Sequence, residues 1–170
     1  SSAAVNNPIQ LKEEIVSDVL KRLSDSRIQD PLGVIREAGD PMIAVAAGIA
    51  STYTGRLYLA GGTQMLAVAS VLARLGLPLP EIVTTIYVRD DPVANCSVIA
   101  EKIGITLTAV DPDFGSIGHA GLAKYCIGEV KEGTGAGGAI FLAHMMGFQL
   151  PEIKEAILRF VTTYCPSKPL

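Results

Sequence analysis

The chain has 170 residues, which suits one compact domain, and 49% of them are hydrophobic, enough for a sizeable core. Positive and negative side chains nearly balance at a net charge of -3, only 5% of residues are aromatic, and the sequence has no basic run. This composition argues against nucleic-acid binding and favours small ligands. The longest apolar segment, Met42 to Ala50, is too short to cross a membrane, so we expect a soluble protein.

Cysteine usage and the first residues indicate the compartment. Cys96, Cys126 and Cys165 are widely spaced and show no Cys-x-x-Cys or Cys/His pattern. We therefore expect no disulfide framework, no metal, no cofactor and a reducing, cytoplasmic location. The sequence begins at Ser1 without an initiator Met, a basic segment or an apolar segment, which is untypical of a signal peptide. This start is what the middle of a longer chain would show.

Three helices are predicted at the beginning of the chain. Apolar residues recur at three-to-four spacing from Leu11 to Leu23, which predicts an amphipathic helix. Asp30 and Asp40 each precede a proline, a pattern that predicts helices over about 31–38 and 41–52. Because the second of these two helices is apolar nearly all round, we expect it to be buried against a sheet.

Short β-prone runs then alternate with helical ones. Strands are predicted over Arg56–Ala60, Ile82–Val88 and Ile105–Val110, and helices over Gln64–Arg74 and Pro92–Ile103. Strands that are joined by helical crossovers are parallel, with right-handed connections. We therefore predict a three-layer α/β fold of Rossmann-like type, a mainly parallel sheet flanked by helices, which forms part of a larger domain.

The chain is expected to form a single α/β domain over residues 1–170. Residues 1–55 are a helical lead-in, and residues 56–146 are a strand–helix core that binds a nucleotide. Residues 147–170 are a C-terminal helix and tail, with an apolar face from Ile153 to Val161.

Polar and glycine-rich turns follow the three predicted strands. Ligands of open parallel sheets bind outside the carboxyl ends of the strands, so these turns should meet at one rim. An alternative for the first turn is a tight strand-to-helix connection that Gln64 caps. The candidate residues for binding substrate or phosphate are Gly61, Gly62, Thr63, Gln64, Asp90, Ser116, Gly118 and His119.

A glycine-rich turn with one carboxylate follows further along the chain. It reads Lys131-Glu132-Gly133-Thr134-Gly135-Ala136-Gly137-Gly138-Ala139 and leads into an apolar helix over about 139–146. Glycines let backbone N–H groups converge on an oxyanion, and the helix start adds a positive dipole end. We expect Lys131, Gly133, Thr134 and Gly135 to hold a phosphate, and Glu132 to accept a proton from the substrate. The alternative is a plain glycine-rich loop with a solvated glutamate.

Other polar residues have structural explanations. Asp91 precedes a proline and is expected to cap a helix, so no metal site is predicted there. Asp111 and Asp113 could join Glu132 as a carboxylate pair, but Asp-Pro-Asp is also ordinary turn chemistry. His144 lies in an apolar helix and is expected to be a satisfied core or helix-end histidine.

The segment Glu132 to Ala136 resembles the Glu-Gly-Ser/Thr-Gly-Ala motif of the nicotinate-nucleotide-dimethylbenzimidazole phosphoribosyltransferase family, in its archaeal and cyanobacterial branch. Gly39 to Ala44 resembles that family's Gly-Gly-x-Glu-Ile-Ala helix start. Ala60 to Thr63 stands in the place of its Asp-Gly-Phe turn, and Ser116 to His119 resembles its serine-containing loop that ends in Gly-His. The likeness covers about Asn7 to Val161 in the same order and corresponds to the C-terminal half of the family.

The resemblance implies phosphoribosyl transfer from nicotinate mononucleotide to a nitrogen of a dimethylbenzimidazole-like aromatic base in cobalamin nucleotide-loop assembly, with Glu132 as the general base. It also implies an N-terminal half, covalent or separate, which nothing in this chain matches. The predicted apolar helix faces offer more surface than one sheet can cover, so we expect a homodimer or a complex with that half. Of the first turn, only Gly62 carries over directly, and the spacing from Ser116 to His119 differs from the family's. Two other classes stay open, a non-catalytic nucleotide-binding or regulatory module and a structural partner of a separate N-terminal half.

Overall fold

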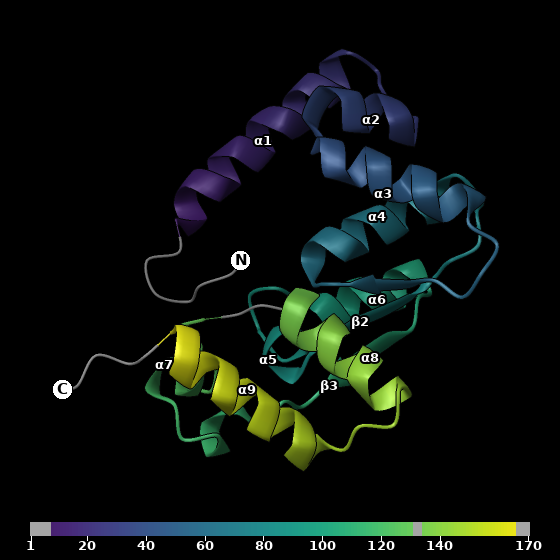
Figure 1. The fold of residues 1–170 in the computed structure, drawn as a ribbon. Coiled ribbons are helices and arrows are strands. Elements are labelled where there is room, and N and C mark those ends of the chain that lie inside the picture. The colour runs from purple at the N-terminus through teal and green to yellow at the C-terminus, as the bar shows by residue number, and fades with distance from the viewer. Residues whose placement is uncertain (1–7, 131–133, 166–170) are drawn as a thin grey trace.

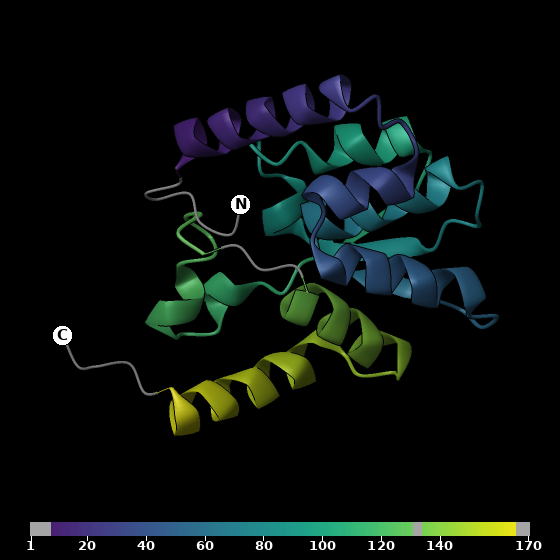
Figure 2. The same ribbon diagram turned by 90° about the horizontal axis from the view of Figure 1, so that it is seen from above.

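The computed structural model describes residues 8–130 and 134–165, which form helices packed around a small parallel sheet (Figure 1). Three helices come first, and the strands alternate with helices after them. Figure 2 shows α1 and α9 at opposite ends of the molecule, with the sheet between them. The elements before and around the sheet are α1 (Ile9–Asp25), α2 (Pro31–Ala38), α3 (Pro41–Thr52), β1 (Tyr58–Ala60), α4 (Thr63–Arg74), β2 (Glu81–Thr85), α5 (Ile86–Arg89), α6 (Cys96–Ile103) and β3 (Leu107–Val110).

Helices α2 and α3 confirm the predictions from local capping. Asp30 Oδ1 accepts the Gly33 N–H at 2.7 Å, and Asp40 Oδ1 accepts the Met42 N–H at 2.8 Å. Each carboxylate therefore satisfies a backbone donor that the start of a helix leaves unpaired, and the following proline needs no such partner. The predicted bounds of α2 and α3 match the observed ones.

The expectation that α3 is buried against the sheet is wrong. α3 packs on α4 and α2, and among its residues only Ala47 is buried. Val45 and Ile49 are 62% and 56% exposed on its outer side. An all-round apolar sequence therefore gave no information about which neighbour the helix would choose.

The sheet has the predicted parallel topology, with strand order β1-β2-β3 in the described part of the chain. Leu59 pairs with Ile82 in the first ladder, and Ile82 pairs with Leu107 in the second. Because all three strands run in the same direction, their carboxyl ends lie at one rim. The prediction of an α/β fold with a parallel sheet flanked by helices is confirmed.

Two predicted boundaries near β2 are wrong. β2 ends at Thr85, and the β-prone residues that follow it form the short helix α5. The helix expected from Pro92 begins at Cys96, after Asn95 in a left-handed conformation at φ 50°. Asp91 therefore caps a turn and not a helix, since its Oδ1 accepts the Val93 N–H at 3.0 Å.

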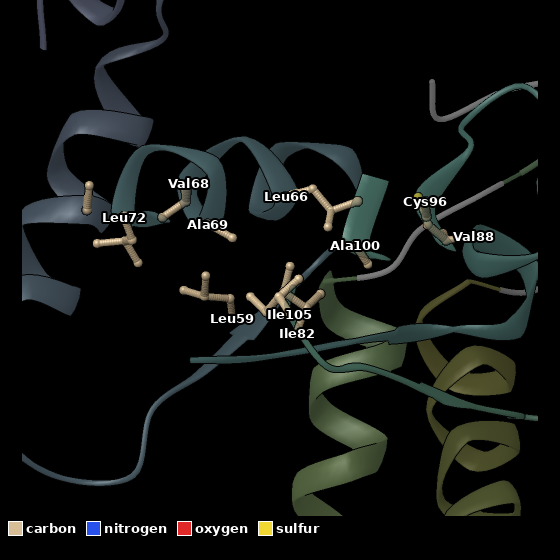
Figure 3. Close-up of a cluster of buried hydrophobic side chains, with 11 residues drawn as sticks. Leu59, Leu66, Val68, Ala69, Leu72, Ile82, Val88, Cys96, Ala100 and Ile105 are labelled. Carbon is tan, nitrogen blue, oxygen red and sulfur yellow. The ribbon is translucent and has the colours of Figure 1, made fainter. Parts of the chain in front are cut away.

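The main core fills the space between the sheet and the helices α4 and α6 (Figure 3). Its largest fully buried members include Leu66, Leu72 and Ile82, which come from α4 and the central strand. Burial of each such side chain stabilises the fold by about 1.5–3 kcal/mol. This cluster fixes α4 over one face of the sheet, while α8 lies below the strands in the same view.

A second, smaller core lies on the α8 side. It joins Phe114, Ile117, Ile140 and Ile153. A π-helix leads directly into α8, so the described part of the predicted glycine-rich turn is helical, which corrects that expectation. The elements on this side are η1 (Phe114–Ser116), α7 (Ala120–Ala123), the π-helix η2 (Thr134–Ala139), α8 (Ile140–Met145) and α9 (Leu150–Tyr164).

The last helix starts with a capping box. Glu152 accepts the Gln149 N–H at 2.8 Å, and the Gln149 side chain bonds in return to the backbone of Glu152. Ile153 is buried against the second core and Leu158 is 38% exposed, so only part of the predicted apolar face is covered. No helix within 8–130 and 134–165 is long and apolar enough to cross a membrane.

Helix α1 leaves its apolar residues uncovered. Ile15, Val16 and Leu20 are 53%, 56% and 61% exposed, and no residue of α1 is buried. Exposed apolar surface of this kind is typical of an association site. We expect the chain to form a dimer in solution, and Val16→Glu with Leu20→Glu to return it to the 17.8 kDa monomer in sedimentation velocity.

The matched control for α1 is Ser17→Glu with Ser24→Glu, which adds the same charge on exposed polar positions of the same helix. This control should leave the dimer intact. A wild-type chain that sediments as a monomer at high concentration would contradict the prediction.

Candidate functional site

The start of the glycine-rich helix lies directly on the carboxyl ends of two strands. A Cβ on Gly137 would stand 2.7 Å from both Cα and the carbonyl carbon of Thr84, and a Cβ on Gly138 would stand 2.4 Å from the Cβ of Ala60. Real Cβ atoms do not come this close, so only glycine permits the contact. These two glycines therefore serve close packing of η2 on the ends of β2 and β1.

The turns that follow the three strands meet through α5. A Cβ on Gly62, after β1, would stand 2.7 Å from Val88 Cγ1 of α5. Phe114 lies in the turn after β3, and its backbone N–H donates to Tyr87 Oη of α5 at 3.2 Å. α5, which follows β2, therefore contacts the turns after β1 and β3.

In the turn between β1 and α4, the predicted site residues act through their backbone atoms. The Gly61 N–H donates to the Val83 carbonyl at 2.9 Å, extending the ladder beyond β1. Gly62 precedes α4 as the N-cap residue, and no side chain caps this helix, so the alternative of Gln64 as a cap is wrong. Thr63 is half-buried and Gln64 is exposed in the first turn of α4.

Asp90 is engaged by its neighbour. Arg89 Nε and Nη2 donate to its two carboxylate oxygens at 2.6 and 2.7 Å. These hydrogen bonds lower the pKa of Asp90 and raise that of Arg89. The negative charge of Asp90 is therefore neutralised by Arg89. The next residue, Asp91, is buried, with 4% of its surface exposed.

Ser116 belongs to a three-residue cluster that links η1 to α9. Lys154 Nζ donates to Asp113 Oδ2 at 2.6 Å and also contacts Ser116 Oγ. Ser116 Oγ donates to Asp113 Oδ2 at 2.5 Å. Asp113 itself adopts a left-handed conformation at φ 49°. Its backbone N–H donates to Asp111 Oδ1 at 2.8 Å, the ordinary turn chemistry that the Asp-Pro-Asp sequence indicates.

The Lys154–Asp113 pair predicts a specific response to acid. The hydrogen bond from Lys154, followed by that from Ser116, lowers the pKa of Asp113. Its stabilising contribution is therefore complete above the ordinary aspartate pKa and is lost as the pH falls through the lowered value. We expect Lys154→Met to lower the thermal midpoint near neutral pH and to reduce its decline in acid, measured by circular dichroism.

Arg159→Met is the control, because Arg159 is an exposed cation of the same helix. It should reproduce the wild-type shape of the acid dependence. Since the Asp113 side chain is 48% exposed, the effect of Lys154→Met on stability should be modest. An unchanged acid limb in Lys154→Met would contradict the assignment.

The two histidines have different surroundings. His144 Nδ1 lies 3.0 Å from the Phe148 carbonyl just beyond α8, as expected for a helix-end histidine. His119 precedes α7, after Gly118 at φ 84°, and its Nε2–H donates to the Cys165 carbonyl at 3.1 Å. His119 Nδ1 is buried and has no hydrogen-bond partner among the described residues. His119 therefore connects its loop to the end of α9.

Sequence reasoning missed two residues at the end of the central strand. Thr84 and Thr85 are both fully buried, and Thr84 Oγ1 has no hydrogen-bond partner in the described part of the chain. A buried hydroxyl without a partner is costly, so it marks a place where a ligand could supply one. The signal was a polar pair directly after the apolar residues Ile82 and Val83 of the central strand.

Tyr87 was also missed. Burial, followed by the contact with Cys126 Sγ at 3.6 Å, raises the pKa of Tyr87 to about 12. Tyr87 therefore stays protonated at neutral pH, and its hydroxyl oxygen holds the Phe114 N–H in place. It orders the turn after β3 and is no candidate base.

The structure describes only part of the glycine-rich segment that is predicted to hold the phosphate and the general base. Lys131, Glu132 and Gly133 lie outside the described residues. The backbone of Thr134 and Gly135 forms the first turn of η2. The proposed phosphate-binding and proton-accepting roles of these residues stay predictions.

Comparison with known proteins finds relatives that share one family name. No family model matches the chain. A UPF0284 protein of Thermococcus gammatolerans is 41% identical over 162 residues, which cover 92% of this chain and 49% of that relative. UPF0284 proteins of Methanothermobacter thermautotrophicus and Pyrobaculum calidifontis are 39% and 37% identical and are covered over 48% and 50% of their lengths.

The chain is similar to UPF0284 proteins over most of its length. It spans about half the length of these relatives. The name UPF0284 states no activity, substrate or partner, and it neither supports nor opposes phosphoribosyl transfer.

Proposed function

We propose that this chain is part of an enzyme that transfers a phosphoribosyl group from nicotinate mononucleotide to a ring nitrogen of an aromatic base of dimethylbenzimidazole type. The resemblance of Glu132 to Ala136 to the phosphoribosyltransferase motif suggests the reaction. The observation that carries the proposal is the contact of Gly137 and Gly138 with the ends of β2 and β1. Those ends form the rim where parallel sheets bind ligands, so the contact is what we would expect if the segment before it takes part in the site.

The reaction suits the residues of this segment. Glu132 would accept the N–H proton of the base while the base nitrogen forms a bond to the anomeric carbon of the ribose. The bond from that carbon to the nicotinate nitrogen breaks, and its electron pair neutralises the cationic ring, so nicotinate is a good leaving group. The helix that begins at Thr134 would place its positive dipole end near the ribose phosphate.

Thr84 gives the rim a further polar group. Its hydroxyl is fully buried beside the backbone that Gly137 contacts, and it has no partner among the residues described. A substrate hydroxyl or a bound water could satisfy it. A hydrogen bond that forms only with bound substrate is one way to orient the ribose against Glu132.

The same proposal includes the assembly. The relatives are about twice as long as this chain, so the missing half would supply further strands and further phosphate contacts. The uncovered apolar residues of α1 are suited to contact either that half or a second copy. We place the reaction in the cytoplasm, in cobalamin nucleotide-loop assembly.

Direct assay of the full-length polypeptide tests the proposal. The protein is incubated with nicotinate mononucleotide and dimethylbenzimidazole, and nicotinate release and the N-ribosyl phosphate product are measured by mass spectrometry. Equal amounts of both products are expected. Binding of nicotinate mononucleotide without any product, over a panel of azole bases that includes adenine, would instead favour a non-catalytic nucleotide-binding module.

A further inference from the structure

An open cavity of about 270 Å³ lies at the amino ends of β1 and β2. Its walls come from the end of α3, the turn between α3 and β1, and the turn between α4 and β2. Because the strands are parallel, this edge of the sheet is opposite to the rim of the candidate site. The lining residues used in the argument below are Tyr53, Arg56, Leu57, Tyr58, Leu79 and Glu81.

Two opposite charges line this cavity, and each is held by a different neighbour. The guanidinium carbon of Arg56 lies over the ring of Tyr58, 6.0 Å from its centre. Tyr58 in turn packs against Phe141 of α8, with ring centroids 4.9 Å apart. The carboxylate of Glu81 accepts the hydroxyl of Thr108 from β3. Contacts with the sheet and with α8 therefore fix the place of both charges.

The two charges do not neutralise each other. Tyr58 pairs with Glu81 in the ladder of β1 and β2, and Arg56 lies two residues before Tyr58, yet Arg56 and Glu81 form no ion pair. Within the described segments, the Arg56 guanidinium has no hydrogen-bond acceptor, and the Glu81 carboxylate accepts from Thr108 alone. A guanidinium binds carboxylates best, and a carboxylate with unused lone pairs binds an ammonium group.

We propose that this cavity binds a free α-amino acid with an apolar side chain. The carboxylate of the amino acid binds Arg56, its ammonium group donates to Glu81, and its side chain packs on Leu79 and the ring of Tyr53. A molecule with one charge would leave the other charged side chain without a partner. The volume lies just below the ~300–1,000 Å³ of drug-sized pockets, which suits so small a ligand. The inference depends on neither the glycine-rich segment nor the proposed transfer reaction.

Calorimetric titration of the full-length polypeptide with leucine tests the proposal. Saturable binding is expected. Isocaproate lacks the ammonium group and isoamylamine lacks the carboxylate, so each should bind at least about tenfold more weakly than leucine. In the unchanged protein, nuclear Overhauser effects are expected between bound leucine and the methyl groups of Leu57 and Leu79. Absence of saturable leucine binding, effects on other methyl groups only, or equal affinity for either analogue would overturn the proposal.

Two substitutions test the two charges separately. Arg56→Met should weaken leucine binding at least about tenfold but should not weaken the binding of isoamylamine, which has no carboxylate. Glu81→Gln should weaken leucine binding but not isocaproate binding, and glutamine can still accept the hydroxyl of Thr108. Arg36→Met removes an exposed cation of α2 outside the cavity and should change no affinity. A folded Arg56→Met protein that binds leucine as the wild type does would overturn the assignment.

Discussion

In the full-length polypeptide, Glu132→Gln should lower turnover about 10²–10⁴-fold, the usual loss when a general base is removed. Glutamine keeps the size of the side chain but cannot accept the N–H proton of the base. Affinity for nicotinate mononucleotide should be unchanged, because in the proposed site backbone N–H groups, and not a carboxylate, hold the phosphate. Single-turnover rates and equilibrium binding, measured separately, check the two halves of this expectation.

Glu129→Gln is the matched control. Glu129 lies three positions before Glu132, and its carboxylate pairs with Lys124 at 2.9 Å. The Glu129→Gln substitution therefore removes a carboxylate that is close in the sequence but has a structural partner. Its turnover should stay within about twofold of wild type, since exposed ion pairs contribute little. If Glu132→Gln reacted at the wild-type rate while binding normally, the general-base assignment would be wrong and a binding module would explain the motif better.

The parts of the fold that depend on local chemistry were predictable. Asp30 and Asp40 cap α2 and α3 through hydrogen bonds that span two or three residues, so the Asp-Pro pattern was sufficient. The parallel sheet followed from the alternation of strands and helices, which restricts topology strongly. These features need no knowledge of distant contacts.

Features that depend on distant partners were not predictable. α3 is apolar all round, yet its choice of α4 over the sheet is a tertiary matter that periodicity does not encode. β-branched residues around Ile86 favoured a longer β2, but the chain turns into α5 to reach the turn that Asp91 caps. The strand propensity of these residues was overridden, because the chain has to turn away from the sheet to reach α6.

The candidate site shows the same division. Glycine and turn patterns located the rim segments, because parallel strands bring their ends together. The partners of individual residues could not be read from the sequence, since Ser116 contacts Lys154 of α9 and His119 contacts Cys165, the residue after α9. Thr84 was overlooked because a threonine inside a strand usually has only a β-forming role.

The glycine-rich segment can be tested for its structural role separately from its chemistry. Gly137→Ala should lower the free energy of unfolding by about 1–3 kcal/mol, because the new Cβ would stand 2.7 Å from the backbone of Thr84. Backbone cannot yield as a flexible side chain can. The gain of up to ~1 kcal/mol in helix propensity offsets only part of this cost. Urea unfolding is followed by circular dichroism. The curves of both proteins are fitted with one shared m-value to give the change in the free energy of unfolding.

Gly48→Ala supplies the opposite expectation from the same substitution. Gly48 lies within α3, and a Cβ there meets nothing within 4 Å, so alanine should raise the free energy of unfolding by about 0.5–1 kcal/mol. A Gly137→Ala variant that is also stabilised would mean that η2 does not lie against β2 as described. The contact that carries the proposed function would then be absent. If Gly137→Ala is destabilised and the full-length protein also loses turnover, the packing of this helix on β2 and the proposed reaction are coupled.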